Sequence, residues 1–169
     1  YSKALVDLAN KKKKLVVLSG DLALDNGLLE FERKFPEKFI ECGIAEQDMV
    51  SQAGGLALQG FLPIVHSFAC FLTQRANEQI YNNASENTHI IYVGSLAGIL
   101  PGMPGHSHQS VRDIALLSNI PNMVMLEPCC EVEVNLALDY LVNKHNGPGY
   151  LRLVSHPLDL PYSLPTDYK

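Results

Sequence analysis

The sequence lacks several features that would place it in common classes of protein. No stretch approaches the roughly 20 apolar residues of a transmembrane helix, so we expect no membrane span. Its 4 cysteines form no CxxC pair, which predicts reduced thiols in a cytoplasmic protein, with neither a disulfide framework nor a zinc site. The net charge is −5, and the single basic run, Lys11 to Lys14, is typical of a solvated helix end. We therefore expect no nucleic acid and no membrane as partners.

The chain also shows no charged-then-apolar leader, and it starts at Tyr1 without an initiator Met. This start predicts that the sequence is trimmed or excised from a longer chain. No internal repeat and no low-complexity segment is present.

What the sequence does contain is enough apolar residues for one globular domain, with 169 residues of which 47% are hydrophobic. Short apolar runs alternate with longer amphipathic ones. The predicted strands are Leu15 to Ser19, Phe39 to Cys42, Leu62 to His66, His89 to Val93, Met123 to Glu127 and Tyr150 to Val154. The predicted helices are Lys3 to Lys12, Leu28 to Phe35, Glu46 to Leu58, Phe71 to Ala84, Ser110 to Ser118 and Glu131 to Lys144.

This alternation predicts an α/β fold with a doubly wound, mostly parallel sheet of about six strands and helices on both faces. The end of the chain differs, because residues 156–169 contain three prolines and no periodicity. We therefore predict a domain over residues 1–155 and a linker or tail over residues 156–169.

Ligands bind at the carboxyl ends of the strands in such a sheet, so the segments there are candidates for a site. Glu46 lies in the first turn of a predicted helix, where an acid ordinarily just complements the helix dipole. Phe68 and Phe71 can line one wall of a crevice, although such a pair is more commonly core. Arg75 can pair with Glu78 on a helix surface.

The segment from Gly94 to Gln109 contains four glycines and two prolines. A shaped loop of this kind between a strand and a helix is typical of a functional site. His106 and His108 have no nearby Cys, Asp or Glu to complete a metal-ligand set, so we predict no metal site in this chain. None of the glycine spacings matches a phosphate-binding loop.

Taken together, these segments resemble the transketolase family. The matching elements are Gly43-Ile-Ala-Glu46-Gln47, Phe68-Ala-Cys-Phe71-Leu-Thr-Gln-Arg75-Ala, and Gly105-His-Ser-His108-Gln109 before Asp113-Ile-Ala-Leu-Leu. Each element alone is moderately specific, but all of them occur in the family's order between Leu15 and Val154. The chain therefore resembles the pyrimidine-binding domain of a transketolase-like enzyme that depends on thiamine diphosphate.

The resemblance implies roles for individual residues. Glu46 matches the glutamate that hydrogen-bonds N1′ of the aminopyrimidine and so favours the tautomer whose 4′-imino group removes the thiazolium C2 proton. Phe68 and Phe71 match the pocket around the pyrimidine ring, and Asp21 and Arg75 match further cofactor-binding positions. The second residue that the resemblance makes catalytic is His108, which faces the substrate and can bond an oxygen of a donor sugar or exchange a proton with it.

The chain departs from the family in the half of the site that binds sugar phosphate. Pro104 replaces an acid that reads a substrate hydroxyl, and Leu96 replaces a histidine. Asp25 stands where relatives use a serine to hold the substrate phosphate, which a carboxylate would repel. Ser155 or His156 takes the place of an arginine. The departures put the use of sugar phosphates in question.

The family's Gly-Asp-Gly motif, which holds Mg²⁺ and the diphosphate, is not matched by Ser19-Gly-Asp21-Leu. The resemblance therefore implies a partner, the diphosphate-binding domain or subunit of the same enzyme, which supplies Mg²⁺ while thiamine diphosphate bridges the two parts. Ala53, Gly54 and Gly55 leave room for close helix packing at such an interface. We expect a homodimer or a hetero-oligomer.

Three interpretations of the function stay open. The first is a transferase component that moves a two-carbon unit through a thiamine-bound carbanion. The second is a relative acting on 2-oxo acids, such as a 1-deoxyxylulose-5-phosphate synthase or the E1 beta component of a 2-oxoacid dehydrogenase. The third is a non-catalytic assembly domain. The loop ending at His108 favours the first, and the retention of Glu46 argues against the third.

Overall fold

The computed structural model describes residues 1–100, 102–154, 160–165 and 168. Its strands form a six-stranded parallel sheet in the order β2-β1-β3-β4-β6-β5, which confirms the predicted doubly wound α/β fold. The strand bounds are β1 Leu15–Ser19, β2 Phe39–Glu41, β3 Leu62–Phe68, β4 Ile91–Ser95, β5 Val124–Leu126 and β6 Gly149–Arg152.

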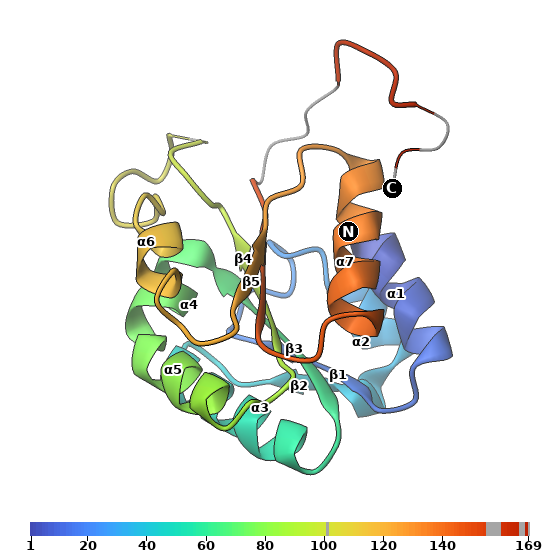
Figure 1. Cartoon of the computed structure of the whole chain (residues 1–169), viewed down its shortest axis with the longest axis vertical. Helices are drawn as coiled ribbons and strands as arrows, with labels where there is room; N and C mark the ends of the chain where they lie inside the picture. The colour runs from blue at the N-terminus through green and yellow to red at the C-terminus, as the bar shows by residue number, and fades with distance from the viewer. Residues whose placement is uncertain (101, 155–159, 166–167, 169) are drawn as a thin grey trace.

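Helices cover both faces of the sheet (Figure 1). On one face lie α3 Glu46–Leu58, α4 Ala69–Arg75, α5 Asn77–Ser85 and α6 Asp113–Leu117. On the other lie α1 Ser2–Lys11, α2 Leu29–Lys34 and α7 Glu131–Asn143, with a short 3₁₀ helix, Pro36–Lys38, before β2. After β2 the chain crosses to the far side of β1, so the ends of β1 and β3 flank the point where the strand order reverses. Ligands bind at this point in doubly wound sheets.

The central strands are apolar throughout because each of their faces is covered. In β1, Val16 and Leu18 join the core under α3, whereas Leu15 and Val17 join the core under α1 and α7. This alternation follows from the two-residue period of a strand. A continuous apolar run such as that from Leu15 to Leu18 is therefore typical of a central parallel strand.

Two predicted helices differ from those in the structure. The helix predicted from Phe71 to Ala84 is two helices, α4 and α5, separated at Ala76. The Thr73 hydroxyl donates to the Ala69 carbonyl at 2.7 Å, a back-bond that bends helices just before this break. The helix predicted from Ser110 starts later because the Ser110 N–H and C=O both pair with Gly98.

Half of the predicted linker over residues 156–169 lies outside the described residues. Residues 160–165 and 168, which are described, form no helix or strand. Among the described helices, none has both the length and the apolar character needed to cross a bilayer.

The small residues of α3 serve the domain's own packing in part. A Cβ added at Gly54 would lie 2.2 Å from Oδ1 of Asn83 in α5, whereas a Cβ at Gly55 would meet nothing within 4 Å. Asn83 in turn donates to the Val50 carbonyl at 2.9 Å. Gly54 is therefore required by the contact between α3 and α5, and Gly55 remains open for an external contact.

We expect opposite effects from alanine at these two positions. Gly55→Ala should raise the free energy of unfolding by up to about 1 kcal/mol, because alanine favours a helix interior and has space here. Gly54→Ala should lower it by about 1–2 kcal/mol, because Asn83 must move and lose its bond to Val50. Urea denaturation of both variants checks this, and equal stabilisation by the two alanines would contradict the assigned packing.

His66 in β3 is a fully buried histidine between two fixed partners. Its Nδ1 lies 3.3 Å from the Leu18 carbonyl, and its Nε2 lies 2.5 Å from the Tyr1 hydroxyl. A carbonyl only accepts, so Nδ1 carries the proton and Nε2 accepts from Tyr1. Burial lowers the pKa of His66 to about 4, and the ring is therefore neutral in the folded protein.

The depressed pKa of His66 predicts a loss of stability in mild acid. Below its ordinary pKa of about 6.5, the unfolded chain binds a proton that the folded protein does not. The free energy of unfolding should therefore fall as the pH drops from about 6.5 to about 4, by up to about 3 kcal/mol from this group. His66→Gln should flatten the curve, with a residual slope from His89, whose pKa is also lowered by burial. An unchanged slope in the variant would disprove the assignment.

Candidate active site

The Glu46 carboxylate is buried at the first residue of α3, where it is only 3% exposed. Arg75, at the end of α4, places Nη1 3.0 Å from both carboxylate oxygens. The Ser67 hydroxyl, near the end of β3, donates to Oε1 at 3.3 Å. Because the Arg75 side chain is 45% exposed, this ion pair lies at the border between core and solvent. Arg75 pairs with Glu46 and not with Glu78, the helix-surface partner considered from the sequence.

Aromatic rings adjoin this ion pair. The Arg75 guanidinium lies 3.9 Å from the centroid of the Phe71 ring, a cation–π contact. The centroids of Phe68 and Phe71 are 5.9 Å apart, and the His108 ring approaches both, at 5.9 and 5.0 Å. The structure thus brings together five of the six predicted site residues from α3, β3, α4 and the long loop.

A concavity of about 580 Å³ opens beside the carboxylate and is lined by residues 44–48 and Arg75. An ionised carboxylate offers about four lone-pair positions. Arg75 and Ser67 together make three contacts with Glu46, so Oε2 retains a position for a further donor. A buried acceptor with adjoining space fits a ligand that carries an N–H donor.

The sixth predicted residue, Asp21, lies apart from this set. It follows β1 in a left-handed conformation, φ 61°, and its N–H donates to Oε1 of Glu41 at 2.7 Å. The same oxygen accepts from the Gly43 N–H at 2.8 Å, so Glu41 fixes the turns after β1 and β2. Within the described part of the chain, no hydrogen bond or ion pair joins the Asp21 carboxylate to Glu46. Its role in binding a cofactor stays a prediction.

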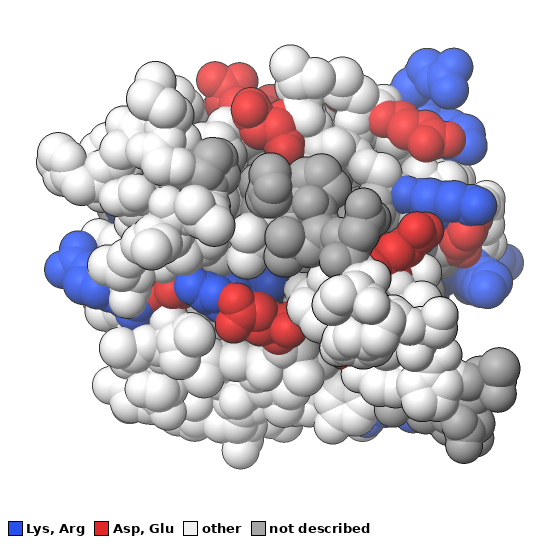
Figure 2. Space-filling view, turned by 90° about the horizontal axis from the view of Figure 1, so that it is seen from above, with Lys and Arg blue, Asp and Glu red and all other residues white. Residues whose placement is uncertain are grey.

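The positions expected to face the substrate are partly described. Asp25 and Pro104 are exposed on loops at this edge of the sheet, and Leu96 follows β4 at φ 52°. Ser155 and His156 lie outside the described residues. Figure 2 views this edge directly and shows that most of the visible surface is uncharged.

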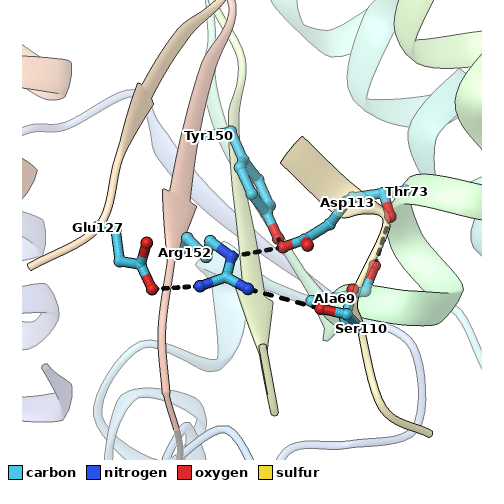
Figure 3. Close-up of polar contacts among 7 residues, drawn as sticks. All are labelled: Ala69, Thr73, Ser110, Asp113, Glu127, Tyr150 and Arg152. Carbon is cyan, nitrogen blue, oxygen red and sulfur yellow. Dashed lines mark hydrogen bonds and ion pairs between the residues drawn. The ribbon is translucent and has the colours of Figure 1, made fainter. Parts of the chain in front are cut away.

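The loop that carries His108 is fixed at its base by a charge network that sequence reasoning did not identify (Figure 3). Asp113, only 1% exposed, accepts at Oδ2 from Nε of Arg152 and from the Tyr150 hydroxyl, each at 2.8 Å. Arg152 also pairs with Glu127 and reaches the Ser110 carbonyl at 3.5 Å. Asp113 was visible in the sequence as part of a matching element, but nothing there indicated that it is buried.

This network depends on close packing around Tyr150. A Cβ at Gly94 would lie 2.5 Å from the Tyr150 hydroxyl, so only glycine fits there. Burial, together with the Asp113 carboxylate, raises the pKa of Tyr150, which keeps its hydroxyl protonated as a donor. The Arg152 side chain is only 12% exposed. Its positive charge therefore neutralises that of Asp113 in a site from which water is largely excluded.

Comparison with known proteins shows the family of the chain. The family model of the transketolase pyrimidine-binding domain matches residues 1–157. The chain belongs to this family. The match confirms the predicted resemblance and, with it, a transketolase-like pyrimidine-binding domain.

Among curated relatives, the 1-deoxy-D-xylulose-5-phosphate synthase of Clostridium acetobutylicum is 37% identical over 153 residues, covering 90% of this chain and 24% of the relative. The 6-deoxy-6-sulfo-D-fructose transketolase subunit SqwH of a Clostridium species is 32% identical over 158 residues, covering 93% of this chain and 49% of the relative. The chain thus spans a quarter to a half of the relatives that it matches.

Solved structures show the same fold. A split-gene transketolase, described as an inactive β4 tetramer, is 33% identical with a TM-score of 0.81 over 96% of this chain and 52% of its own. The transketolase of Campylobacter jejuni, 24% identical, matches with a TM-score of 0.83 over 92% of this chain and 25% of its own. The second likeness supports the fold alone.

The Asp113–Arg152 pair predicts a large penalty for removing one partner. Arg152→Met should lower the free energy of unfolding by about 3–5 kcal/mol, because it leaves a buried carboxylate without its cation. Asp113→Asn in the same chain should recover part of this loss. Lys34→Met is the matched control, since it breaks an exposed pair with Glu30 and should cost under about 1 kcal/mol. A comparable small cost for Arg152→Met, measured by chemical denaturation, would refute the prediction.

Proposed function

We propose that the chain binds the aminopyrimidine of thiamine diphosphate as one half of the active site of a transferase that moves a two-carbon unit. The observation that carries the proposal is the buried Glu46 carboxylate, oriented by Arg75 and Ser67 and left with an acceptor position at Oε2. A helix-dipole role requires none of these contacts, because an exposed acid in the first turn serves it equally well.

Each residue of the set has a proposed task in this site. Glu46 accepts the N1′ proton and shares it, which stabilises the reactive tautomer of the ring. Arg75 fixes the orientation of the carboxylate. Phe68 and Phe71 exclude water and pack against the ring, and His108 faces the substrate. Bound thiamine diphosphate supplies the nucleophilic carbon of the reaction.

The diphosphate and Mg²⁺ require a second domain or subunit. Mg²⁺ takes oxygen ligands, whereas the one group of three potential metal-binding side chains within the described residues contains two thiols. The relatives extend well beyond the matched region, which leaves room for such a domain in the intact enzyme. The assembled enzyme would be a homodimer or a hetero-oligomer. We place it in the cytoplasm, where thiols such as the 4 free cysteines stay reduced.

A 1-deoxyxylulose-5-phosphate synthase is the second candidate function, because a synthase is the 37% identical relative. The two candidates share the role of Glu46 and differ in the substrate half of the site. Asp25 and Pro104 indicate that this half is altered from the usual sugar-phosphate pattern. A small ketose or 2-oxo acid remains the proposed substrate class.

The role of Glu46 is tested by hydrogen–deuterium exchange at C2 of the cofactor in the enzyme assembled with its diphosphate-binding partner. Glu46→Gln should slow exchange by about 10²-fold or more, because glutamine cannot share a proton with N1′. The fold should survive, since Arg75 is half-exposed and its charge can be hydrated.

The matched control is Glu131→Gln, which removes an exposed acid from the first turn of α7 on the opposite face of the sheet. It should leave both exchange and assembly unchanged. Equal exchange rates for wild type and Glu46→Gln would exclude the proposed function and favour the non-catalytic assembly domain.

A further inference from the structure

Two thiols and a carboxylate converge at the start of α7, away from the Glu46 site. Cys129 and Cys130 follow β5, and Glu133 lies in the first turn of the helix. The Cys129 thiol donates to Oε2 of Glu133 at 2.9 Å, and the Cys129 N–H donates to the same oxygen at 2.8 Å. One ligand atom from each of the three side chains lies within 4.8 Å of the others.

This spacing is close to that of a tetrahedral zinc site. Zn–S bonds of about 2.3 Å and a Zn–O bond of about 2.1 Å place neighbouring ligand atoms about 3.6–3.8 Å apart. Cys129 is exposed, and Cys130 and Glu133 are partly exposed, so small rotations suffice to reach this geometry. Thiolate ligands select Zn²⁺ over Mg²⁺ and Ca²⁺, which take oxygen ligands.

Hydrogen bonds around the cluster orient the Glu133 carboxylate so that one oxygen faces the thiols. The Tyr168 hydroxyl donates to Oε1 of Glu133, which leaves Oε2 to face the thiols. Metal ligands typically have such outer hydrogen-bond partners, which fix their orientation.

We propose that Cys129, Cys130 and Glu133 bind one Zn²⁺. Both thiols lose their protons to solvent, two S–Zn bonds and one O–Zn bond form, and the hydrogen bond from the Cys129 thiol is replaced. Water or a group from another polypeptide completes the tetrahedron, for which the adjoining concavity of about 390 Å³, lined in part by Glu133 and Tyr168, offers space. The site would tie the start of α7 to the end of β5 and to Tyr168.

The alternative is an ordinary helix cap, in which Glu133 reaches back to the N–H preceding the cap residue and the thiols have no ligand. The absence of a CxxC spacing led us to expect no zinc site from the sequence. The third ligand, Glu133, lies four residues after Cys129, and the start of α7 at Glu131 brings the two side chains together.

The experiment is titration of the full chain with Co²⁺ under a non-thiol reductant, followed by competition with Zn²⁺. We expect one equivalent of Co²⁺ to give thiolate-to-metal charge-transfer absorption, Zn²⁺ to displace it with a Kd below about 1 μM, and about two protons to be released. Cys129→Ser, Cys130→Ser and Glu133→Gln should each weaken binding by about 100-fold or more. Tyr168→Phe should weaken it by about 10-fold.

Cys42→Ser is the matched control, since the Cys42 thiol donates to the Ile40 carbonyl after β2 and is not one of the three proposed ligands, so the change should not affect the titration. Circular dichroism verifies that each variant is folded. The proposal is wrong if wild type shows no charge-transfer absorption, or if Cys129→Ser binds as tightly as wild type. Binding that survives Glu133→Gln unchanged would also overturn it, because the carboxylate would then not be a ligand.

Discussion

All six strands run in the same direction, and each functional segment depends on that constraint. Parallel strands end at one edge of a sheet, so residues far apart in sequence meet there. Glu46 enters this edge after β2, Phe68 ends β3, and the loop of His108 follows β4. The apolar cores on both faces of the sheet hold this edge in place, which lets the loops there diverge without disturbing the fold.

Charge is buried at two places beside this edge, with different consequences. Asp113 is surrounded by Arg152 and Tyr150, and all its contacts serve to fix the base of the His108 loop. Glu46 is equally buried, but its cation, Arg75, is half-exposed and its Oε2 keeps an acceptor position. The first arrangement is complete within the domain. The Glu46 arrangement leaves one acceptor position open, which a ligand can fill. It lies at the point where the strand order reverses.

The core of the domain is therefore fully packed by its own residues, whereas the edge at the strand ends leaves an acceptor and a glycine open for contact with another molecule. Gly54 is used in packing α3 on α5, whereas Gly55 is open. The concavity beside Glu46 is bordered by residues 44–48, with no oxygen-rich metal cluster among the described residues. A partner domain that supplies diphosphate and Mg²⁺ ligands would complete the site without any change in this core.

The sequence by itself determined that six strands alternate with helices, because short apolar runs such as Leu15 to Leu18 are typical of strands covered on both faces, although some bounds differ, as in β4, which starts at Ile91 and not at His89. It also determined the start of α3 at Glu46. It also predicted site roles for Glu46, Phe68, Phe71 and His108 through motifs. Only the tertiary structure decided that Arg75 binds Glu46 and that Arg152 neutralises Asp113. The local pattern of apolar residues indicates which elements are buried. The partner of a charged side chain, in contrast, depends on packing between elements that are distant in sequence.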